Sequence, residues 1–292
     1  MATVKIKAAA KVNLTLDITG KRADGYHDIR TVMQSVGLFD TITLTENDTE
    51  VITVSCNNPD VPCDERNIVF KCAVCFYNKL GKECGGLHID IDKNIPTQAG
   101  LAGGSADGAA VMSGLNELHG KPFSQSELEE LGGKVGADIP FCIHGGTVLC
   151  EGTGTALTPL GAIPKCSFVL VKHPVGISTA QAYAAVDSRT VKPEPSTDKL
   201  LVSLGKVEKI GSLLHNDFED TLSITEILDL KRELSEYDGA CGACMSGSGS
   251  TVFAIFTDEE KANECAEVFK KRYEEVFTAV KVDYGTKLLS KE

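Results

Sequence analysis

The fold of this chain is decided by one glycine-rich stretch, Pro96-Thr97-Gln98-Ala99-Gly100-Leu101-Ala102-Gly103-Gly104-Ser105-Ala106-Asp107. It follows a segment with strand periodicity at residues 87–91 and precedes a segment with helical periodicity that ends at Gly120. Small side chains let backbone N–H groups approach an anion, and the unpaired N–H groups at the start of a helix attract phosphate. We therefore predict that this stretch, the first glycine loop, binds phosphate and that Ser105 caps the helix after it.

The first glycine loop differs from the two commonest nucleotide-binding motifs. It lacks the Lys-Ser/Thr ending of a Walker A loop, and no acidic residue at the right distance completes a dinucleotide-binding G-x-G-x-x-G motif. A plain turn between strand and helix is the alternative, because glycine clusters are common in loops. A second glycine loop either flanks the same phosphates or is a structural turn; it reads Met245-Ser246-Gly247-Ser248-Gly249-Ser250.

The hydropathy pattern around these loops predicts an α+β fold with two domains. Period-two alternation and apolar runs indicate strands at residues 5–7, 41–45, 51–54, 87–91, 147–150, 168–172 and 251–256. Helical spacing indicates helices at residues 67–80, 105–120, 124–133 and 259–277. Prolines predict a surface loop at residues 191–198 and a boundary near residues 159–164, which separates a domain of residues 1–160 from one of residues 161–292.

The composition limits the partners and the compartment. The 292-residue chain has 29 Lys and Arg against 41 Asp and Glu, and its net charge of −12 disfavours nucleic acid or an anionic membrane as a partner. Its N-terminus lacks the apolar run of a signal peptide, and no run of about 18 apolar residues could span a membrane. The 11 cysteines are irregularly spaced and indicate reduced thiols, so we expect a cytoplasmic protein.

Isolated polar residues in apolar segments are the candidates for chemistry. Asp138 lies within Gly136-Ala137-Asp138-Ile139-Pro140-Phe141 and is either a helix N-cap or a reactive carboxylate. Lys11 and Asn13 are two positions apart and share one face of a strand, where an exposed lysine is the alternative. The pairs Cys72-x-x-Cys75 and Cys241-x-x-Cys244 raise a zinc or thiol-redox protein as a competing class, but the two pairs are too far apart for a zinc ribbon.

Taken in order along the chain, these motifs resemble the GHMP kinases, a family that includes galactokinase, homoserine kinase and mevalonate kinase. The resemblance rests on Lys11-Val12-Asn13-Leu14, Gly20-Lys21-Arg22-Ala23-Asp24-Gly25-Tyr26-His27, both glycine loops, residues 136–141 and Asn216-Asp217-Phe218-Glu219. It implies ATP-dependent phosphorylation of a small-molecule hydroxyl group, in a two-domain fold with the active site in the cleft between the domains. Gly25-Tyr26-His27 resembles the members whose acceptor is a cytidine diphosphate-linked methylerythritol; a homoserine or mevalonate type of acceptor is the alternative.

The resemblance also implies roles for individual residues. Asp138 is the catalytic base and Lys11 its partner, which suits phosphoryl transfer because a carboxylate accepts the hydroxyl proton and an ammonium stabilises the developing charge. Asn13 helps to hold the acceptor, Tyr26 stacks on cytosine and His27 contacts its polar edge. Thr179 and Tyr183 close over the acceptor from the second domain.

The same resemblance implies a binding site for ATP, formed by Asn67, Lys93, Pro96, Gly100, Leu101, Ala102, Gly103, Gly104, Ser105 and Ala106. Mg²⁺ is expected with ATP because it offsets the triphosphate charge. The motifs contain no obvious carboxylate ligand for the ion, although Ser105 could offer a hydroxyl group. Ala102 stands where the family has glycine, so we expect it to adopt a negative φ. We expect a monomer or a homodimer.

Overall fold

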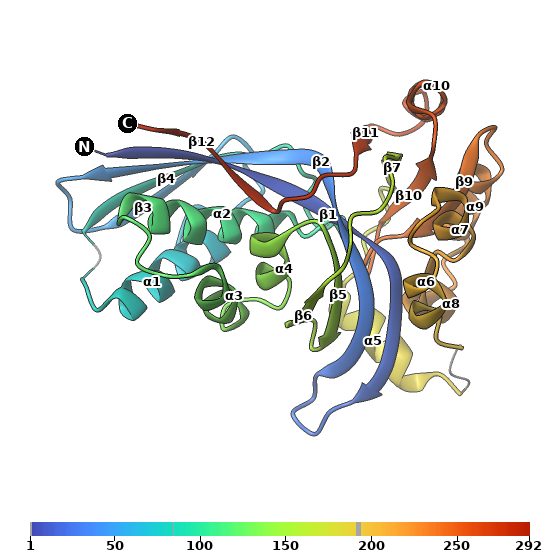
Figure 1. Ribbon diagram of the computed structural model, residues 1–292, viewed down its shortest axis with the longest axis horizontal. Helices are drawn as coiled ribbons and strands as arrows, with labels where there is room; N and C mark the ends of the chain where they lie inside the picture. The colour runs from blue at the N-terminus through green and yellow to red at the C-terminus, as the bar shows by residue number, and fades with distance from the viewer. Residues whose placement is uncertain (1, 84, 191–193) are drawn as a thin grey trace.

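The structure is a computed structural model that describes residues 2–83, 85–190 and 194–292, and it contains two β-sheets with helices (Figure 1). The first sheet has the order β12-β1-β2-β4-β3, with β5 and β6 attached through β2 and with β8 paired to β1. Its strands are β1 (Thr3–Lys21), β2 (His27–Asn47), β3 (Ile52–Cys56), β4 (Gly86–Asp92), β5 (Thr147–Gly152), β6 (Ala156–Pro159), β8 (His215–Asn216) and β12 (Thr286–Lys291). The last strand of the chain therefore returns to the first sheet, while a domain boundary near residue 160 stays a prediction.

The second sheet has the order β11-β7-β10-β9. It consists of β7 (Ser167–Lys172), β9 (Ala240–Met245), β10 (Thr251–Phe256) and β11 (Val276–Val280). Both faces are buried: Phe168 and Leu170 pack into the larger apolar cluster with the first sheet, whereas Val169 and Val171 pack with the helices behind. Strands buried on both faces lose polar alternation and read as continuous apolar runs, as residues 168–171 do.

Ten helices are described. They are α1 (Ile68–Leu80), α2 (Gly103–Leu118), α3 (Gln125–Gly133), α4 (Ile139–His144), α5 (Thr179–Ser188), α6 (Thr197–Leu201), α7 (Val207–Ser212), α8 (Asp217–Leu222), α9 (Thr225–Ser235) and α10 (Glu259–Phe269). Helices α1 to α4 gather on one side of the first sheet (Figure 1). Helices α7 and α9 pack on opposite faces of the second sheet, since Ile210 of α7 belongs to the larger apolar cluster and Leu230 of α9 to the other. The α+β fold is confirmed, and no described helix has the length and apolar character needed to cross a membrane.

Helix α2 packs closely between α1 and the first sheet because it carries glycine at its contact points. A Cβ atom on Gly108 would lie 2.8 Å from the sulfur of Cys72, and one on Gly114 would lie 2.6 Å from a methyl carbon of Leu44. Glycine weakens a helix by about 1 kcal/mol relative to alanine. In α2 this loss of helix stability is accepted, because a larger residue at Gly108 or Gly114 would push the helix away from α1 or from the first sheet.

Strands β1 and β2 form one long hairpin that the periodicity did not reveal. They pair from Thr3 with Thr45 to Lys21 with His27, with register shifts on β1 at Ala9/Ala10, Asn13/Thr15 and Ile18/Gly20. The middle of β1 is buried without interruption, and the register shifts interrupt the regular alternation of faces along the two strands. Short predicted strands at 5–7 and 41–45 were therefore only the ends of much longer ones.

Two other boundaries were wrong. The helix predicted at residues 259–277 ends at Phe269, because Val276 and Ala279 are needed as buried residues of the edge strand β11. In the loop predicted at 191–198, residues 191–193 lie outside the described residues and Thr197 and Asp198 begin helix α6.

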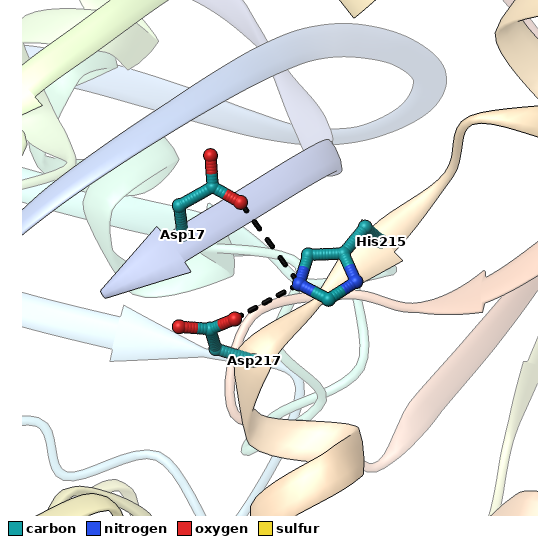
Figure 2. A group of neighbouring side chains, drawn as sticks. All are labelled: Asp17, His215 and Asp217. Atoms are coloured by element: carbon teal, nitrogen blue, oxygen red, sulfur yellow. Dashed lines mark hydrogen bonds and ion pairs between the residues drawn. The ribbon is translucent and has the colours of Figure 1, made fainter. Parts of the chain in front are cut away.

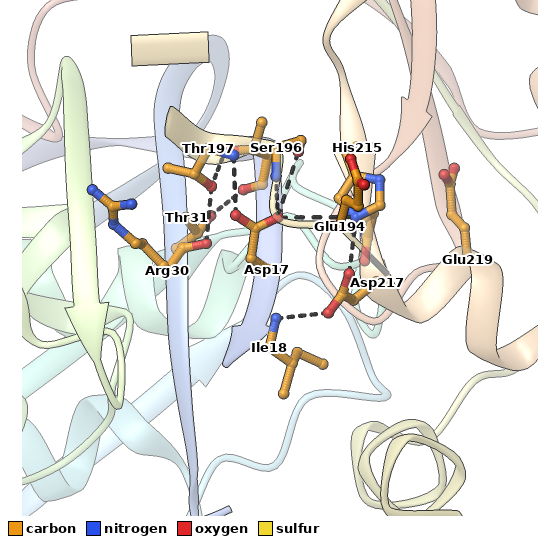
Figure 3. A network of polar contacts seen from close by, with 12 residues as sticks. Asp17, Ile18, Arg30, Thr31, Glu194, Ser196, Thr197, His215, Asp217 and Glu219 are labelled. Atoms are coloured by element: carbon orange, nitrogen blue, oxygen red, sulfur yellow. Dashed lines mark hydrogen bonds and ion pairs between the residues drawn. The ribbon is translucent and has the colours of Figure 1, made fainter. Parts of the chain in front are cut away.

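A polar network ties β1 to the second half of the chain (Figure 3). The carboxylate of Asp17 accepts hydrogen bonds from the backbone N–H groups of Ser196 and Thr197, each at 3.0 Å. The carboxylate of Asp217 accepts from the N–H of Ile18 at 2.8 Å and from the guanidinium of Arg189 at 3.1 Å. Strand β1 is thus bonded to the starts of α6 and α8 in the second half of the chain.

His215 lies between these two carboxylates (Figure 2). Its Nε2 is 2.8 Å from Asp217 and 3.9 Å from Asp17. The three side chains have the composition of a metal site, but each carboxylate oxygen already accepts a hydrogen bond. We therefore interpret the group as a hydrogen-bonded clasp between the first sheet, to which Asp17 and His215 belong, and helix α8, which begins at Asp217. The hydrogen bond to Asp217 raises the pKa of His215 above its usual value.

The clasp predicts a pH-dependent contribution to stability. A raised folded-state pKa means that the contribution of His215 is complete below the unfolded pKa of about 6.5 and is lost as the pH rises through the folded pKa. The difference in melting temperature between wild type and His215→Gln should therefore be larger at about pH 6 than at about pH 9 in thermal unfolding followed by circular dichroism.

His88→Gln is the matched control for this measurement, since His88 bonds to the hydroxyl groups of Thr53 and Ser55 and to no carboxylate of the described residues. If the difference in melting temperature between wild type and His215→Gln stays constant or grows as the pH rises, the imidazolium does not stabilise the clasp.

Candidate active site

One large cavity of about 1400 Å³ lies where the two halves of the chain meet. Its wall includes all of the site residues expected from the sequence except Leu101 and Ala106, which are buried in the core. The expected residues that line it are Lys11, Asn13, Tyr26, His27, Asn67, Lys93, Pro96, Gly100, Ala102, Gly103, Gly104, Ser105, Asp138, Thr179 and Tyr183. Segments more than 200 residues apart in the chain therefore form one site.

Lys11 and Asp138 form an ion pair at this cavity, with Nζ 3.8 Å from Oδ2. The side chain of Lys11 is 4% exposed and that of Asp138 is 31% exposed. Asp138 occupies the N-cap position of α4 but makes no capping hydrogen bond, which leaves its carboxylate available. A buried cation thus lies beside a carboxylate that a ligand can reach.

Asn13 holds Lys11 in place. The Nζ of Lys11 donates to Oδ1 of Asn13 at 2.6 Å, and Nδ2 of Asn13 donates to the hydroxyl of Thr31 at 2.9 Å. The backbone N–H of Asn13 donates to Oγ of Ser246, whose hydroxyl donates to the carbonyl of Gly100. The strand with Lys11 is therefore bonded to both glycine loops.

The first glycine loop curls through left-handed residues before α2. Gln98, Gly100 and Ala102 have φ values of 52°, 72° and 58°. The expectation of a negative φ at Ala102 is wrong, because the residue is the N-cap of α2 and turns the chain into the helix. A left-handed alanine costs roughly 1–2 kcal/mol, which the surrounding contacts must offset.

Ser105 does not cap α2 as predicted. The helix already begins at Gly103, no side chain of the described residues caps it, and Ser105 lies half-buried in its first turn beside the exposed Gly104. The N–H groups at this end are therefore left for an external acceptor, and an anion suits the positive end of the helix dipole.

Lys93 lies beneath the loop in a buried cluster with Asp40 and Asp107. Its Nζ bonds to Asp40 and lies 3.0 Å from Asp107, while Asp40 also accepts the N–H of Ile95. Burial raises the pKa of Asp107 well above its usual value although Lys93 opposes this, and Oδ1 of Asp107 has no hydrogen-bond partner among the described residues. A Cβ atom on Gly103 would come within 2.7 Å of Nζ of Lys93, so the cluster supports the start of α2 directly.

Asn67 caps helix α1 at the edge of the same cavity. Its Oδ1 accepts the N–H of Val69 at 3.0 Å and its Nδ2 donates to the carbonyl of Pro62 at 2.6 Å. Both polar atoms of the side chain are therefore engaged in the turn before α1. Contact of Asn67 with a nucleotide stays a prediction.

The second glycine loop is held by the Asn216-Asp217-Phe218-Glu219 motif. Nδ2 of Asn216 donates to the carbonyls of Met245 and Gly247 at 2.8 and 2.7 Å. Glu219 accepts the N–H of Met245 at 2.6 Å and pairs with Lys231. This loop is thus a shaped wall of the cavity, and Gly247 lies next to Lys11, since an added Cβ would be 3.3 Å from Nζ.

Aromatic side chains line the other end of the cavity. Tyr26 is 68% exposed, so it is not a core residue, and the ring of His27 stacks on Tyr183 with centroids 4.5 Å apart. Tyr183 also meets the edge of Phe218 at 5.0 Å, and burial raises its pKa to about 12. The hydroxyl of Thr179 bonds to that of Ser248 at 2.9 Å, which joins α5 to the second glycine loop.

Sequence reasoning missed three residues of this site. Asp107 is the last residue of the first glycine loop, so its carboxylate could have been singled out from the sequence. Asp40 and Asp187 lie in segments without a recognisable motif and could not. Asp187 pairs with both Lys21 and His27. These contacts come from chain segments that are distant in sequence.

Comparisons with known proteins agree on one family. The model of the GHMP kinases N terminal domain matches residues 67–146, and that of the GHMP kinases C terminal region matches residues 200–275. A protein of Clostridium botulinum (strain Alaska E43 / Type E3) named 4-diphosphocytidyl-2-C-methyl-D-erythritol kinase is 43% identical over 275 residues, covering 93% of this chain and 98% of its own. A protein of Caldicellulosiruptor saccharolyticus with the same name is 42% identical, and the match covers 93% of this chain and 94% of that protein.

Solved structures agree as well. A crystal structure of 4-(cytidine 5'-diphospho)-2C-methyl-D-erythritol kinase superposes with a TM-score of 0.79 at 26% identity, covering 95% of this chain and 98% of that one. A homoserine kinase from Cytophaga hutchinsonii ATCC 33406 superposes with a TM-score of 0.77 at 21% identity, covering 98% and 97%, which shows a shared fold.

The contact between the glycine loops predicts that Gly100→Ala weakens nucleotide binding. The new Cβ would lie 2.0 Å from the carbonyl oxygen of Ser246, at a residue with φ of 72°. The loop must shift, and a misplacement of about 1 Å costs on the order of 100-fold in rate. We expect the KM for ATP to rise at least about tenfold in a coupled assay of ADP release.

Gly161→Ala is the matched control, because an added Cβ there meets nothing within 4 Å and the residue lies outside the cavity. If Gly100→Ala binds ATP normally while its melting temperature is unchanged, the two loops do not shape the phosphate site together.

Proposed function

The chain belongs to the GHMP kinase family, and on that premise we propose that it transfers the γ-phosphoryl group of ATP to the 2-hydroxyl group of 4-diphosphocytidyl-2-C-methyl-D-erythritol. It is an ATP-dependent phosphotransferase of isoprenoid precursor biosynthesis, as its relatives above 40% identity are. The observation that carries the proposal is the Lys11–Asp138 pair at 3.8 Å, in a cavity with an uncapped helix N-terminus and an aromatic wall.

Phosphoryl transfer requires positioning and charge stabilisation more than covalent chemistry by the protein. In our proposal, the acceptor hydroxyl lies against the carboxylate of Asp138, which takes its proton as the oxygen attacks phosphorus. The ammonium of Lys11 stabilises the negative charge that develops on the attacking oxygen and on the transferring group. Asn13 holds the lysine in the required position through its 2.6 Å hydrogen bond.

We place the ATP phosphates at the start of α2, where Gly103, Gly104 and Ser105 present backbone N–H groups. Helix α1 and residues near Asn67 and Pro96 line the adjoining part of the cavity and suit the nucleoside. Lys93 acts from below the loop, since its charge is shared with Asp40 and Asp107. Because the two carboxylates compensate that charge, Lys93 contributes by holding the start of α2 in place behind Gly103.

Magnesium fits this site by the chemistry of its donors. Mg²⁺ prefers oxygen ligands and usually binds through one or two protein groups plus substrate phosphates. The hydroxyl of Ser105 lies in the half-buried first turn of α2, and the carboxylate of Asp107, two residues further along the helix, has an oxygen without a hydrogen-bond partner among the described residues. These two residues would hold the ion, which when bound offsets the charge of the triphosphate.

The competing classes have less support. A homoserine or mevalonate type of acceptor has no base for the stacked His27 and Tyr183 and the exposed Tyr26 to bind. For a zinc or thiol-redox protein, the ten described cysteines are all free, and burial raises the pKa of Cys72 and Cys244 well above the usual thiol value. Buried thiols of this kind are poor nucleophiles and poor ligands.

Replacing the proposed base tests the reaction. Asp138→Asn keeps the shape of the side chain but cannot accept a proton, so kcat should fall by about 10²–10⁴-fold while ATP binding, measured by calorimetry, is retained. Asp238→Asn is the control, because that exposed carboxylate pairs with Lys261 away from the cavity. Near-normal turnover of Asp138→Asn would assign the base elsewhere.

Replacing Tyr26 tests the identity of the acceptor pocket. Base stacking on an aromatic ring is worth about 1–3 kcal/mol, so Tyr26→Ala should raise the KM for the acceptor by roughly 5- to 150-fold and leave the KM for ATP within about twofold. Tyr26→Phe keeps the ring and should behave like wild type. A fall in ATP affinity with unchanged acceptor affinity would reverse the assignment of the two pockets.

A further inference from the structure

Asp187 joins the two halves of the chain at the aromatic end of the cavity. It lies on α5, and its two carboxylate oxygens bond separately to the end of β1 and the start of β2. Oδ2 accepts from Nζ of Lys21, and Oδ1 lies 2.7 Å from Nε2 of His27. Lys21 and His27 are themselves paired residues of the β1–β2 hairpin. No motif of the sequence pointed to this carboxylate.

The pairing determines which nitrogen of His27 carries the proton. An ionised carboxylate can only accept hydrogen bonds, and a neutral imidazole has one donor and one acceptor nitrogen. The hydrogen bond from Lys21 lowers the pKa of Asp187, which keeps the carboxylate ionised. Nε2 must therefore be the donor, and Nδ1 is left as an acceptor.

The geometry leaves little freedom to this imidazole. The side chain of His27 is 6% exposed and its ring is fixed by stacking on Tyr183 at an interplanar angle of 17°. Nδ1 has no hydrogen-bond partner among residues 2–83, 85–190 and 194–292, and His27 lines the cavity. A lone pair with a fixed direction is thus presented at the wall where the base of the acceptor is proposed to bind.

We propose that Asp187 is a positioning residue that fixes the Nε2–H tautomer of His27 and thereby selects cytosine over uracil in the acceptor. The inference rests on the proposed function. Cytosine carries an amino donor at the position where uracil carries a carbonyl acceptor. Nδ1 of His27 accepts a hydrogen bond from the amino group of cytosine. Opposite the carbonyl oxygen of uracil it has no donor, and the two lone pairs repel each other. A site whose acceptor is left unpaired rejects the wrong ligand.

The proposed selection of cytosine over uracil uses residues from both halves of the chain. Lys21 and His27 come from the hairpin, whereas Asp187 and Tyr183 lie one helical turn apart on α5. Helix α5 is bonded to the second glycine loop through Thr179 and Ser248. The carboxylate that orients His27 is therefore positioned by the same segment that supplies the stacking ring.

The test compares two acceptors that differ only in the base, the cytidine and the uridine diphosphate derivatives of methylerythritol. Wild type should prefer the cytidine compound in kcat/KM. Asp187→Asn can present either its oxygen or its NH₂ group to Nε2, so both tautomers become accessible and the preference should shrink by about tenfold or more. The change should lie in KM for the cytidine compound, with kcat nearly unchanged.

Asp198→Asn is the control variant. It removes a carboxylate that is 71% exposed and pairs with Arg30, and it should keep the preference of wild type.

A second measurement uses the unmodified protein. With ¹⁵N-labelled histidine, NMR shifts distinguish the two neutral tautomers, and His27→Gln identifies the signals of His27 among the six histidines. Well above the usual titration range of imidazole, we expect the Nε2–H form. An Nδ1–H form would overturn the inference even if Asp187→Asn fails to fold.

An unchanged preference in folded Asp187→Asn would also overturn the inference and would leave the proposed function intact. If wild type phosphorylates neither nucleotide acceptor but another small alcohol, the proposed function fails together with the base selection, and the NMR result then reports only on the pairing of Asp187 with His27.

Discussion

The site depends on one buried cation, Lys93, held between Asp40 of β2 and Asp107 of α2. Removing one partner from a buried ion pair typically costs about 3–5 kcal/mol, because the remaining charge is left without compensation. The cluster fixes the start of α2 against the first sheet, since Lys93 lies directly behind Gly103 and Asp40 also accepts the N–H of Ile95. The uncapped helix end can therefore stay open toward the cavity, although free N–H groups would otherwise be satisfied by a capping side chain.

The second constraint is the close approach of the two glycine loops. Gly100 leaves no room for a Cβ atom beside the carbonyl of Ser246, and the hydroxyl of Ser246 bonds back to the carbonyl of Gly100. Asn216 and Glu219 hold the second loop from below. The bond from Ser246 to Gly100 joins residues 146 positions apart, and the motif at residues 216–219 supports the second loop in that position.

The sequence allowed prediction of features that depend on neighbouring residues, but not of features that depend on contacts between distant segments. The first glycine loop before a helix and helix α1 follow from short-range chemistry, and the structure contains both. Short-range chemistry left Asp138 open between an N-cap and a reactive carboxylate, and the structure places it at the N-cap position of α4 without a capping hydrogen bond. The length of β1 and β2 was hidden because their middle is buried on both faces and shifts register. The left-handed Ala102 is imposed by the turn into α2, and Lys93 reads as an ordinary strand-end lysine until Asp40 and Asp107 are folded around it.

A continuous series of contacts connects the aromatic wall to the reacting pair. Asp187 and Thr179 share α5, Thr179 bonds to Ser248, and the neighbouring Gly247 lies against Nζ of Lys11. Binding energy from a remote part of a substrate accelerates a reaction only if it helps to position the reacting groups. Because the aromatic wall and Lys11 both contact the second glycine loop, an acceptor that positions α5 correctly also positions the loop beside Lys11. Under the proposed function, the aromatic end of the cavity therefore helps to position the proposed reacting pair as well as to bind the base.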